Sequence, residues 1–133
     1  MNHRAVIAAG LLLLVLASMP TRAPAQTPPA PAPGSAWLPR GEAELQVLDK
    51  INDRGQTLEV KDGASAKVGS LSIAVQSCLI RAPNQPADAA AFLVITDSHP
   101  DAPGFRGWMF QSDPAVSMMQ HPIYDVRVLG CRA

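Results

Sequence analysis

The chain has 133 residues, of which 47% are hydrophobic and 17% charged, and its formal net charge at pH 7 is zero. The basic residues are scattered singly and form no stripe of the kind that neutralises phosphates, so a nucleic-acid partner is not expected. Binding to an anionic membrane surface is disfavoured for the same reason.

Residues 1–25 have the three parts of an export signal. A short basic start precedes a small and apolar stretch from Ala5 to Ala17, and Ala23-Pro24-Ala25 fits the small-x-small rule for signal peptidase. We therefore expect cleavage between Ala25 and Gln26 and a periplasmic location. Because a membrane-spanning helix needs roughly twenty apolar residues, no stable membrane anchor is expected after cleavage.

The residues beyond the leader are enough for one small domain. We expect a proline-rich linker over residues 26–40 and a β domain over residues 41–133. Pro and Ala interleave through most of the linker, and this composition favours an extended tether because it cannot build a core. Trp37 lies near the end of this linker and is expected to dock onto the folded domain.

The domain itself shows short apolar runs separated by turn residues, with no long stretch of helical period, which predicts an all-β fold. Leu45 to Lys50 and Gln56 to Val60 flank Asn52-Asp53-Arg54-Gly55, a sequence typical of a hairpin loop. Residues 71–76 and 124–128 alternate apolar with small or polar side chains, so each strand should bury one face. Residues 91–95 are apolar on both faces, which predicts a central strand covered from both sides.

One helix is expected in the chain, over Asp113 to Gln120. Pro114 suits its first turn and Pro122 its end. The predicted fold is therefore a small sandwich or partly open barrel of about seven short antiparallel strands with one short helix.

Cys78 and Cys131 remain after cleavage, and an even pair in an exported chain most often forms a disulfide. A redox-active thiol pair is the weaker alternative, since the C-x-x-C spacing is missing. Counting alternation along the strands places both cysteines on the more polar face of adjacent strands, unless a bulge shifts the count.

Several sequence segments resemble a family of exported bacterial proteins, domain-of-unknown-function family 2155. They are Gly104-Phe105-Arg106-Gly107-Trp108-Met109-Phe110, then Pro114, Ser117, His121-Pro122, Tyr124-Asp125-Val126 and Cys131, together with residues 43–50 and 88–93 upstream. The resemblance covers nearly all of residues 43–131. It implies a Gram-negative cell-envelope setting and carries no assigned activity. This chain has Gln120 where family members commonly have an acidic residue.

Ser117, His121 and Asp125 have the residue types of a hydrolase triad, and a small envelope hydrolase using His121 with Ser117 or Asp125 is one alternative function. Pro122 interrupts any helix that would align the three, and no Gly-x-Ser-x-Gly elbow surrounds Ser117. The preferred expectation is that the protein is not an enzyme.

A periplasmic metal-binding protein using His99, His121 and the methionines is a second alternative. Only two histidines remain after cleavage, and closed metal sites usually need three or four protein ligands, so no metal and no cofactor are expected.

Arg106, Trp108 and Phe110 share one face of a predicted strand, with His99 in the preceding loop. Burial in the core is the plain interpretation for the aromatic rings. If they instead lie on the surface beside Arg106, they form an amphipathic ledge suited to an envelope protein, a peptide or a glycan. The sequence thus favours a non-catalytic binding or accessory module with its binding surface at these residues.

Overall fold

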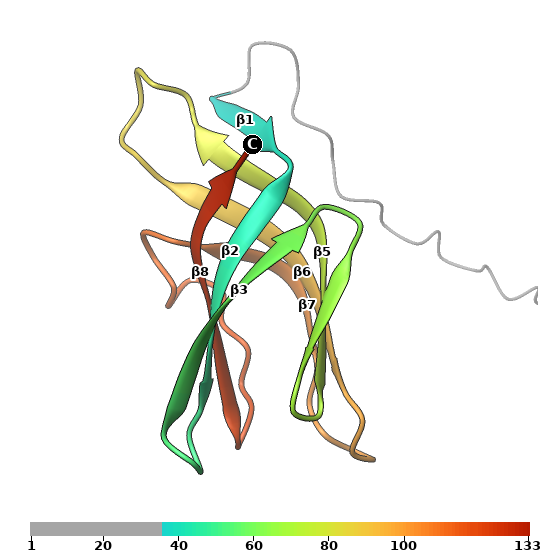
Figure 1. The fold of residues 1–133 in the computed structure, drawn as a ribbon. Coiled ribbons are helices and arrows are strands. Elements are labelled where there is room, and N and C mark those ends of the chain that lie inside the picture. Colours follow the sequence, from blue (N-terminus) through green and yellow to red (C-terminus); the bar gives the residue numbers. More distant parts are fainter. Residues whose placement is uncertain (1–35) are drawn as a thin grey trace, which may run out of the picture.

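The computed structural model describes residues 36–133, which form eight strands: β1 (Trp37–Arg40), β2 (Glu42–Asp49), β3 (Arg54–Lys61), β4 (Ser65–Val68), β5 (Leu71–Arg81), β6 (Ala89–Asp97), β7 (Phe105–Phe110) and β8 (Tyr124–Arg132). The first sheet has the order β1-β5-β6-β7, with β4 also paired to β5, and the second has the order β3-β2-β8. All pairings are antiparallel. The two sheets pack on each other as a sandwich and do not close into a barrel (Figure 1). The all-β prediction is confirmed.

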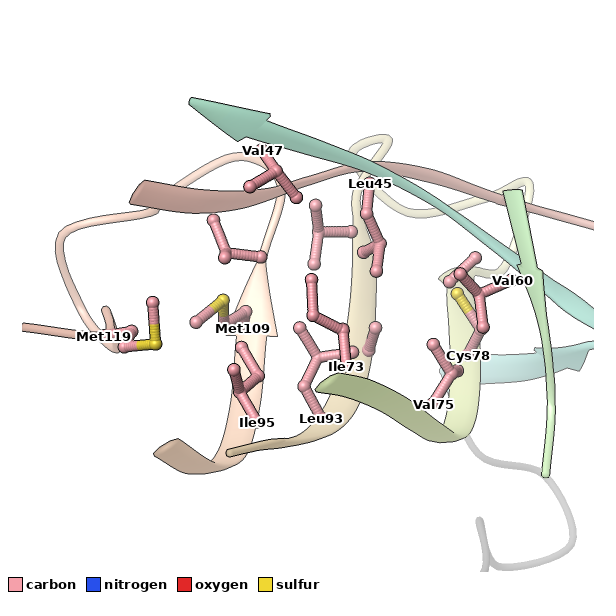
Figure 2. Packing of buried hydrophobic residues seen from close by; sticks show 14 of the residues in the cluster. Leu45, Val47, Val60, Ile73, Val75, Cys78, Leu93, Ile95, Met109 and Met119 are labelled. Atoms are coloured by element: carbon pink, nitrogen blue, oxygen red, sulfur yellow. The ribbon is translucent and has the colours of Figure 1, made fainter. Parts of the chain in front are cut away.

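The core lies between the sheets. Leu45 and Val47 of β2 point toward Ile73, Leu93 and Met109 of the opposite sheet (Figure 2). None of these five side chains is more than 2% exposed. Since each buried side chain of this size contributes about 1.5–3 kcal/mol, this layer is the main source of stability.

The predicted alternation is confirmed in three places. The β2–β3 hairpin is present, although its turn lies at residues 50–53, so that Arg54 and Gly55 of the predicted loop belong to β3. The odd-numbered residues at the start of β5 and the even-numbered ones at the start of β8 face the core. β6 is central, as expected, but only one of its faces lies in the core. Phe92 and Val94 on its other face are partly exposed, so the prediction of cover on both sides is wrong in that detail.

The helix predicted over Asp113 to Gln120 is wrong. The segment makes a single turn in which the Val116 amide donates to the Asp113 carbonyl at 3.3 Å. The Ser112 amide is bonded to the carboxylate of Asp88 at 3.0 Å, so the segment is tied to the start of β6. A helix of two turns gains too few hydrogen bonds to offset its nucleation cost without a buried face. No helix in the described residues is long and apolar enough to cross a bilayer.

The end of the predicted linker is structured. Trp37–Arg40 form β1, which pairs with β5 in the register Trp37 opposite Arg81. Pro39 is tolerated because β1 lies at the edge of its sheet. The ordered domain therefore includes residues that were expected to belong to the tether, while the predicted leader and residues 26–35 lie outside the described residues.

The disulfide between Cys78 and Cys131 is present, with its Cα atoms 5.7 Å apart. The predicted position of the two cysteines is wrong, because both strands contain a bulge. The register of β5 shifts between Val75 and Ser77, which turns Cys78 into the core, where it is fully buried. A second shift in the pairing of β2 with β8 turns Cys131 toward the same space. The bond therefore joins the two sheets instead of adjacent strands of one sheet.

Candidate functional site

The outer face of the five-stranded sheet carries most of the aromatic residues of the domain. Met109 points into the core, so its neighbours Trp108 and Phe110 point away from it, and both are partly exposed. Arg106 lies on the same side of β7 and is exposed. The structure thus brings Arg106, Trp108 and Phe110 together on the surface, as the ledge hypothesis requires, and excludes Trp108 and Phe110 from the core.

Two further rings extend this surface across the sheet. Phe92 of β6 meets Trp108 edge to face, with ring centroids 5.4 Å apart and an angle of 82° between the planes. Trp37 of β1 lies 6.2 Å from Phe110 at an angle of 54°. Edge-to-face pairs of this kind contribute about 0.5–1.5 kcal/mol beyond their burial, so the rings hold one another in place.

Two arginines complete the surface. The guanidinium of Arg81 lies over the Trp37 ring at 4.2 Å, and that of Arg106 lies 5.6 Å from the centre of the Phe92 ring. Both are within the range of a cation–π contact. We use the term aromatic face for the set Trp37, Arg81, Phe92, Arg106, Trp108 and Phe110.

The aromatic face covers a small apolar layer of its own. Leu79 and Ala90 lie opposite each other and beside Phe110 on the outer side of the sheet, and they are only 7% and 2% exposed. Neither belongs to the cluster between the sheets. The rings therefore form an organised surface and are not scattered side chains.

His99 does not lie on the aromatic face. It follows the C-terminal end of β6. Asp97, the last residue of that strand, lies about 16 Å along the strand from Phe92. Its imidazole Nδ1 contacts Asp97 Oδ1 at 2.8 Å, and its side chain is 66% exposed. The prediction that groups His99 with Arg106 and the rings is therefore not met by the geometry.

Asp97 is the centre of a polar cluster at that end of the sheet. Its carboxylate accepts hydrogen bonds from the His99 amide at 2.7 Å, the Ser70 hydroxyl at 2.8 Å and His121 Nε2 at 3.0 Å. The His99 amide, followed by the Ser70 hydroxyl and the His99 ring, holds the pKa of the Asp97 carboxyl well below its usual range, against the opposite effect of burial. The cluster joins the β4–β5 turn, the end of β6 and the segment before β8.

The ring of His121 is fully engaged in this cluster. Its Nδ1 accepts from the amides of Ile123 and Tyr124, both at 3.1 Å, so the ring proton lies on Nε2 and points to Asp97. With its side chain 1% exposed, the imidazole has no free nitrogen to serve as a base. This arrangement fits a structural role.

The triad residues are not assembled around His121. Asp125 Oδ2 is bonded to Arg127 Nε at 3.1 Å, and no hydrogen bond within the described residues links Ser117 to the imidazole. A cleft of about 540 Å³ lies beside this segment. Its lining includes His121 and Asp125 but not Ser117, and both ring nitrogens of His121 are already bonded to Asp97 and to backbone amides.

The methionines and histidines considered for a metal site are also dispersed. Met109 is in the core and Met118 is 50% exposed on the loop between β7 and β8. Asp97 does bring His99 and His121 near each other. Across residues 36–133, however, no group of three or more His, Cys, Asp and Glu side chains is arranged to hold a metal ion.

Sequence reasoning missed half of the aromatic face. Trp37 is expected to dock onto the domain from the linker, but the sequence does not indicate which surface it joins, and Phe92 lies in a run that is apolar at every position. The signal for Phe92 is its parity: it alternates with Ala91 and Leu93, which face the core. Arg81 could not be found in this way, because the bulge before Ser77 changes the count along β5.

Comparison with known proteins identifies the family of the chain. The profile of the family described as "Uncharacterized protein conserved in bacteria (DUF2155)" matches residues 43–131. The chain belongs to this family. The match begins in β2 and ends in β8, so the DUF2155 region includes every strand except β1 and three of the four rings of the aromatic face.

One relative is an uncharacterised protein of Rickettsia prowazekii (strain Madrid E), 26% identical over 91 residues. The similarity covers 66% of this chain and 59% of that protein, so the chain spans about three fifths of the relative's length. No solved structure matches the chain significantly.

Proposed function

We propose that this DUF2155 protein is a non-catalytic binding module of the bacterial cell envelope, and that the aromatic face is its binding surface. The observation that carries the proposal is the placement of both tryptophans and two of the three phenylalanines on the outer side of a sheet whose core is filled without them. Rings of this size each remove about 150–250 Å² from water when a partner covers them. Trp and Arg are also the residues that most often dominate binding energy at interfaces.

The chemistry of the aromatic face favours a peptide or protein partner over a glycan. The Trp108 indole and the guanidiniums of Arg81 and Arg106 are hydrogen-bond donors only, and no carboxylate belongs to the set. Sugar hydroxyls need acceptors as well as donors. A peptide backbone offers carbonyl acceptors to these donors and apolar side chains to the rings.

An envelope location is proposed from two features. The first 25 residues have the pattern of a cleavable export signal. The disulfide between Cys78 and Cys131 is compatible with an oxidising compartment such as the periplasm. Bacterial membership of the family agrees with this setting.

A photocrosslinking experiment in the exporting bacterium tests the proposal. A photoreactive amino acid replaces Arg106, which is exposed on the aromatic face, and in a control strain it replaces Thr57, which is exposed on β3 of the opposite sheet. We expect discrete adducts from position 106 and none of the same mass from position 57. Equal adduct patterns at the two positions, or no adducts at position 106, would overturn the proposal.

A further inference from the structure

We propose that the chain carries a ligand for its own aromatic face, the proline-rich segment Gln26–Pro33. The inference rests on the proposed function, since it takes the aromatic face to be a binding surface, and it names the class of peptide that binds there. A partner from the envelope would then have to displace this segment.

The position of the segment in the chain supports the proposal. The described structure begins at Ala36, and the next residue, Trp37, is already part of the aromatic face. Gly34 and Ser35 separate Pro33 from the domain and provide a short connection. A tether this short supplies an effective concentration of order millimolar, so even a weak contact would be well populated.

The length of the segment also suits the surface. In polyproline II form, the six residues Pro28–Pro33 would span about 19 Å. The sheet measures about 14 Å from β1 to β7, since three strand spacings separate them. The segment is therefore long enough to cross the rings from Trp37 to Trp108.

The chemistry of the two surfaces is complementary. Half of the residues in Gln26–Pro33 are proline, and none is charged. Proline has a carbonyl acceptor and no N–H donor, and the Trp108 indole and the two guanidiniums of the aromatic face supply N–H donors. Proline-rich segments dock against surfaces lined by aromatic rings, and the pairs Phe92–Trp108 and Trp37–Phe110 supply four rings on one face of the sheet.

Fluorine NMR of the exported protein labelled with 5-fluorotryptophan tests this inference, because the chain has only two tryptophans. The Trp108 signal is assigned with a Trp108→Phe variant. Pro28, Pro29, Pro31 and Pro33 are then replaced by Ser in one protein, and Pro83 and Pro86 of the β5–β6 loop are replaced by Ser in a matched control.

We expect the fourfold substitution to move the Trp108 resonance and to increase its H2O/D2O isotope shift, since a covering segment is lost from the ring. The loop control should leave both values unchanged. Adding a synthetic peptide of residues 26–35 to the fourfold variant should return the signal toward its original position. An unchanged Trp108 signal in the fourfold variant overturns the inference.

Two further outcomes separate this inference from the proposed function. If the Trp108 signal depends on protein concentration, the occupant is the segment of a second copy, and binding within one chain is wrong. If the signal is unaffected while adducts still form at position 106, the aromatic face binds a foreign partner only, and the proposed function survives without the inference. If the proposed function and the inference are both correct, the fourfold substitution should raise the adduct yield at position 106 several-fold, because the partner no longer competes with the segment.

Discussion

His121 donates a hydrogen bond from Nε2 to Asp97 Oδ2 at 3.0 Å, and both side chains are 1% exposed. The bond links the segment before β8 to the end of β6, so it crosses between the two sheets. It also occupies the imidazole that a hydrolase would need as its base. This hydrogen bond gives His121 a structural role, and the aromatic face remains the candidate for function.

Replacing His121 with Ala should lower the free energy of unfolding by about 2–4 kcal/mol, because it leaves buried partners of three hydrogen bonds unsatisfied. His121→Asn is the informative comparison. Its side-chain carbonyl can accept from the Ile123 and Tyr124 amides in place of Nδ1, so the loss should be smaller. Urea unfolding measures both variants, and equal stability of the Ala variant and the unmodified protein would contradict the assignment.

The Asp97 carboxylate predicts an acid-dependent part of the stability. Its pKa is lower in the folded protein than the ordinary value of about 3.9 expected in the unfolded chain. A depressed pKa stabilises the fold fully above the unfolded value, and this contribution is lost as the pH falls through the folded value.

Asp97→Asn should therefore lower the melting temperature at pH 7 by several degrees. The difference from the unmodified protein should narrow as the pH falls below about 4. Thermal unfolding at a series of pH values, followed by circular dichroism, measures the difference. A difference in melting temperature that stays constant from pH 7 to pH 2 would show that the charge of Asp97 contributes nothing to the stability.

Substitutions at Gly69 and Tyr124 should have non-additive effects on the free energy of unfolding. Gly69 has φ of +56°, and a Cβ at this position would collide with the Tyr124 hydroxyl oxygen. Gly69→Ala should destabilise the domain by about 1–3 kcal/mol. Part of that cost should disappear in Gly69→Ala/Tyr124→Phe, because the colliding oxygen is absent. Denaturant titration of the unmodified protein, the two single variants and the double variant measures the coupling. If the effects of the two single substitutions are simply additive, the steric explanation is wrong.

The disulfide should account for a large share of the stability. It closes a loop with a sequence separation of 53 residues. For such a loop, chain entropy predicts about 4 kcal/mol. Reduction should lower the urea midpoint of the unmodified protein, while a Cys78→Ala/Cys131→Ala control should not respond to the reductant. Two free thiols in native protein purified without reductant would be the contrary result.

Period-two alternation was sufficient to predict the strands that contribute the core. Leu71, Ile73 and Val75 follow it without interruption, and so do Tyr124, Val126 and Val128. The pattern failed where the backbone departs from it. A bulge is one extra residue without a reliable sequence signature, and the two bulges are the reason that Cys78 and Cys131 were placed on the wrong face.

The aromatic face shows the limit of sequence reasoning about the site. Alternation around Met109 assigns Arg106, Trp108 and Phe110 to one side of β7, but the side that faces the core depends on the packing of β8 against the sheet. Trp37 and Arg81 join the surface through the β1–β5 pairing, which connects residues far apart in the chain. Local patterns do not contain such contacts.

The most direct test of the binding surface compares Trp108 with its neighbour Met109, since the two side chains lie on opposite faces of β7. Trp108→Ala should cost about 1 kcal/mol from its lost ring contact, whereas Met109→Ala should cost about 2–5 kcal/mol because it empties a core position. The decisive measurement is the adduct yield at position 106 per folded molecule of Trp108→Ala. We expect a stable domain that has lost its adducts. A Trp108→Ala protein that stays folded and keeps the full yield would contradict it, as would a collapse as severe as that of Met109→Ala.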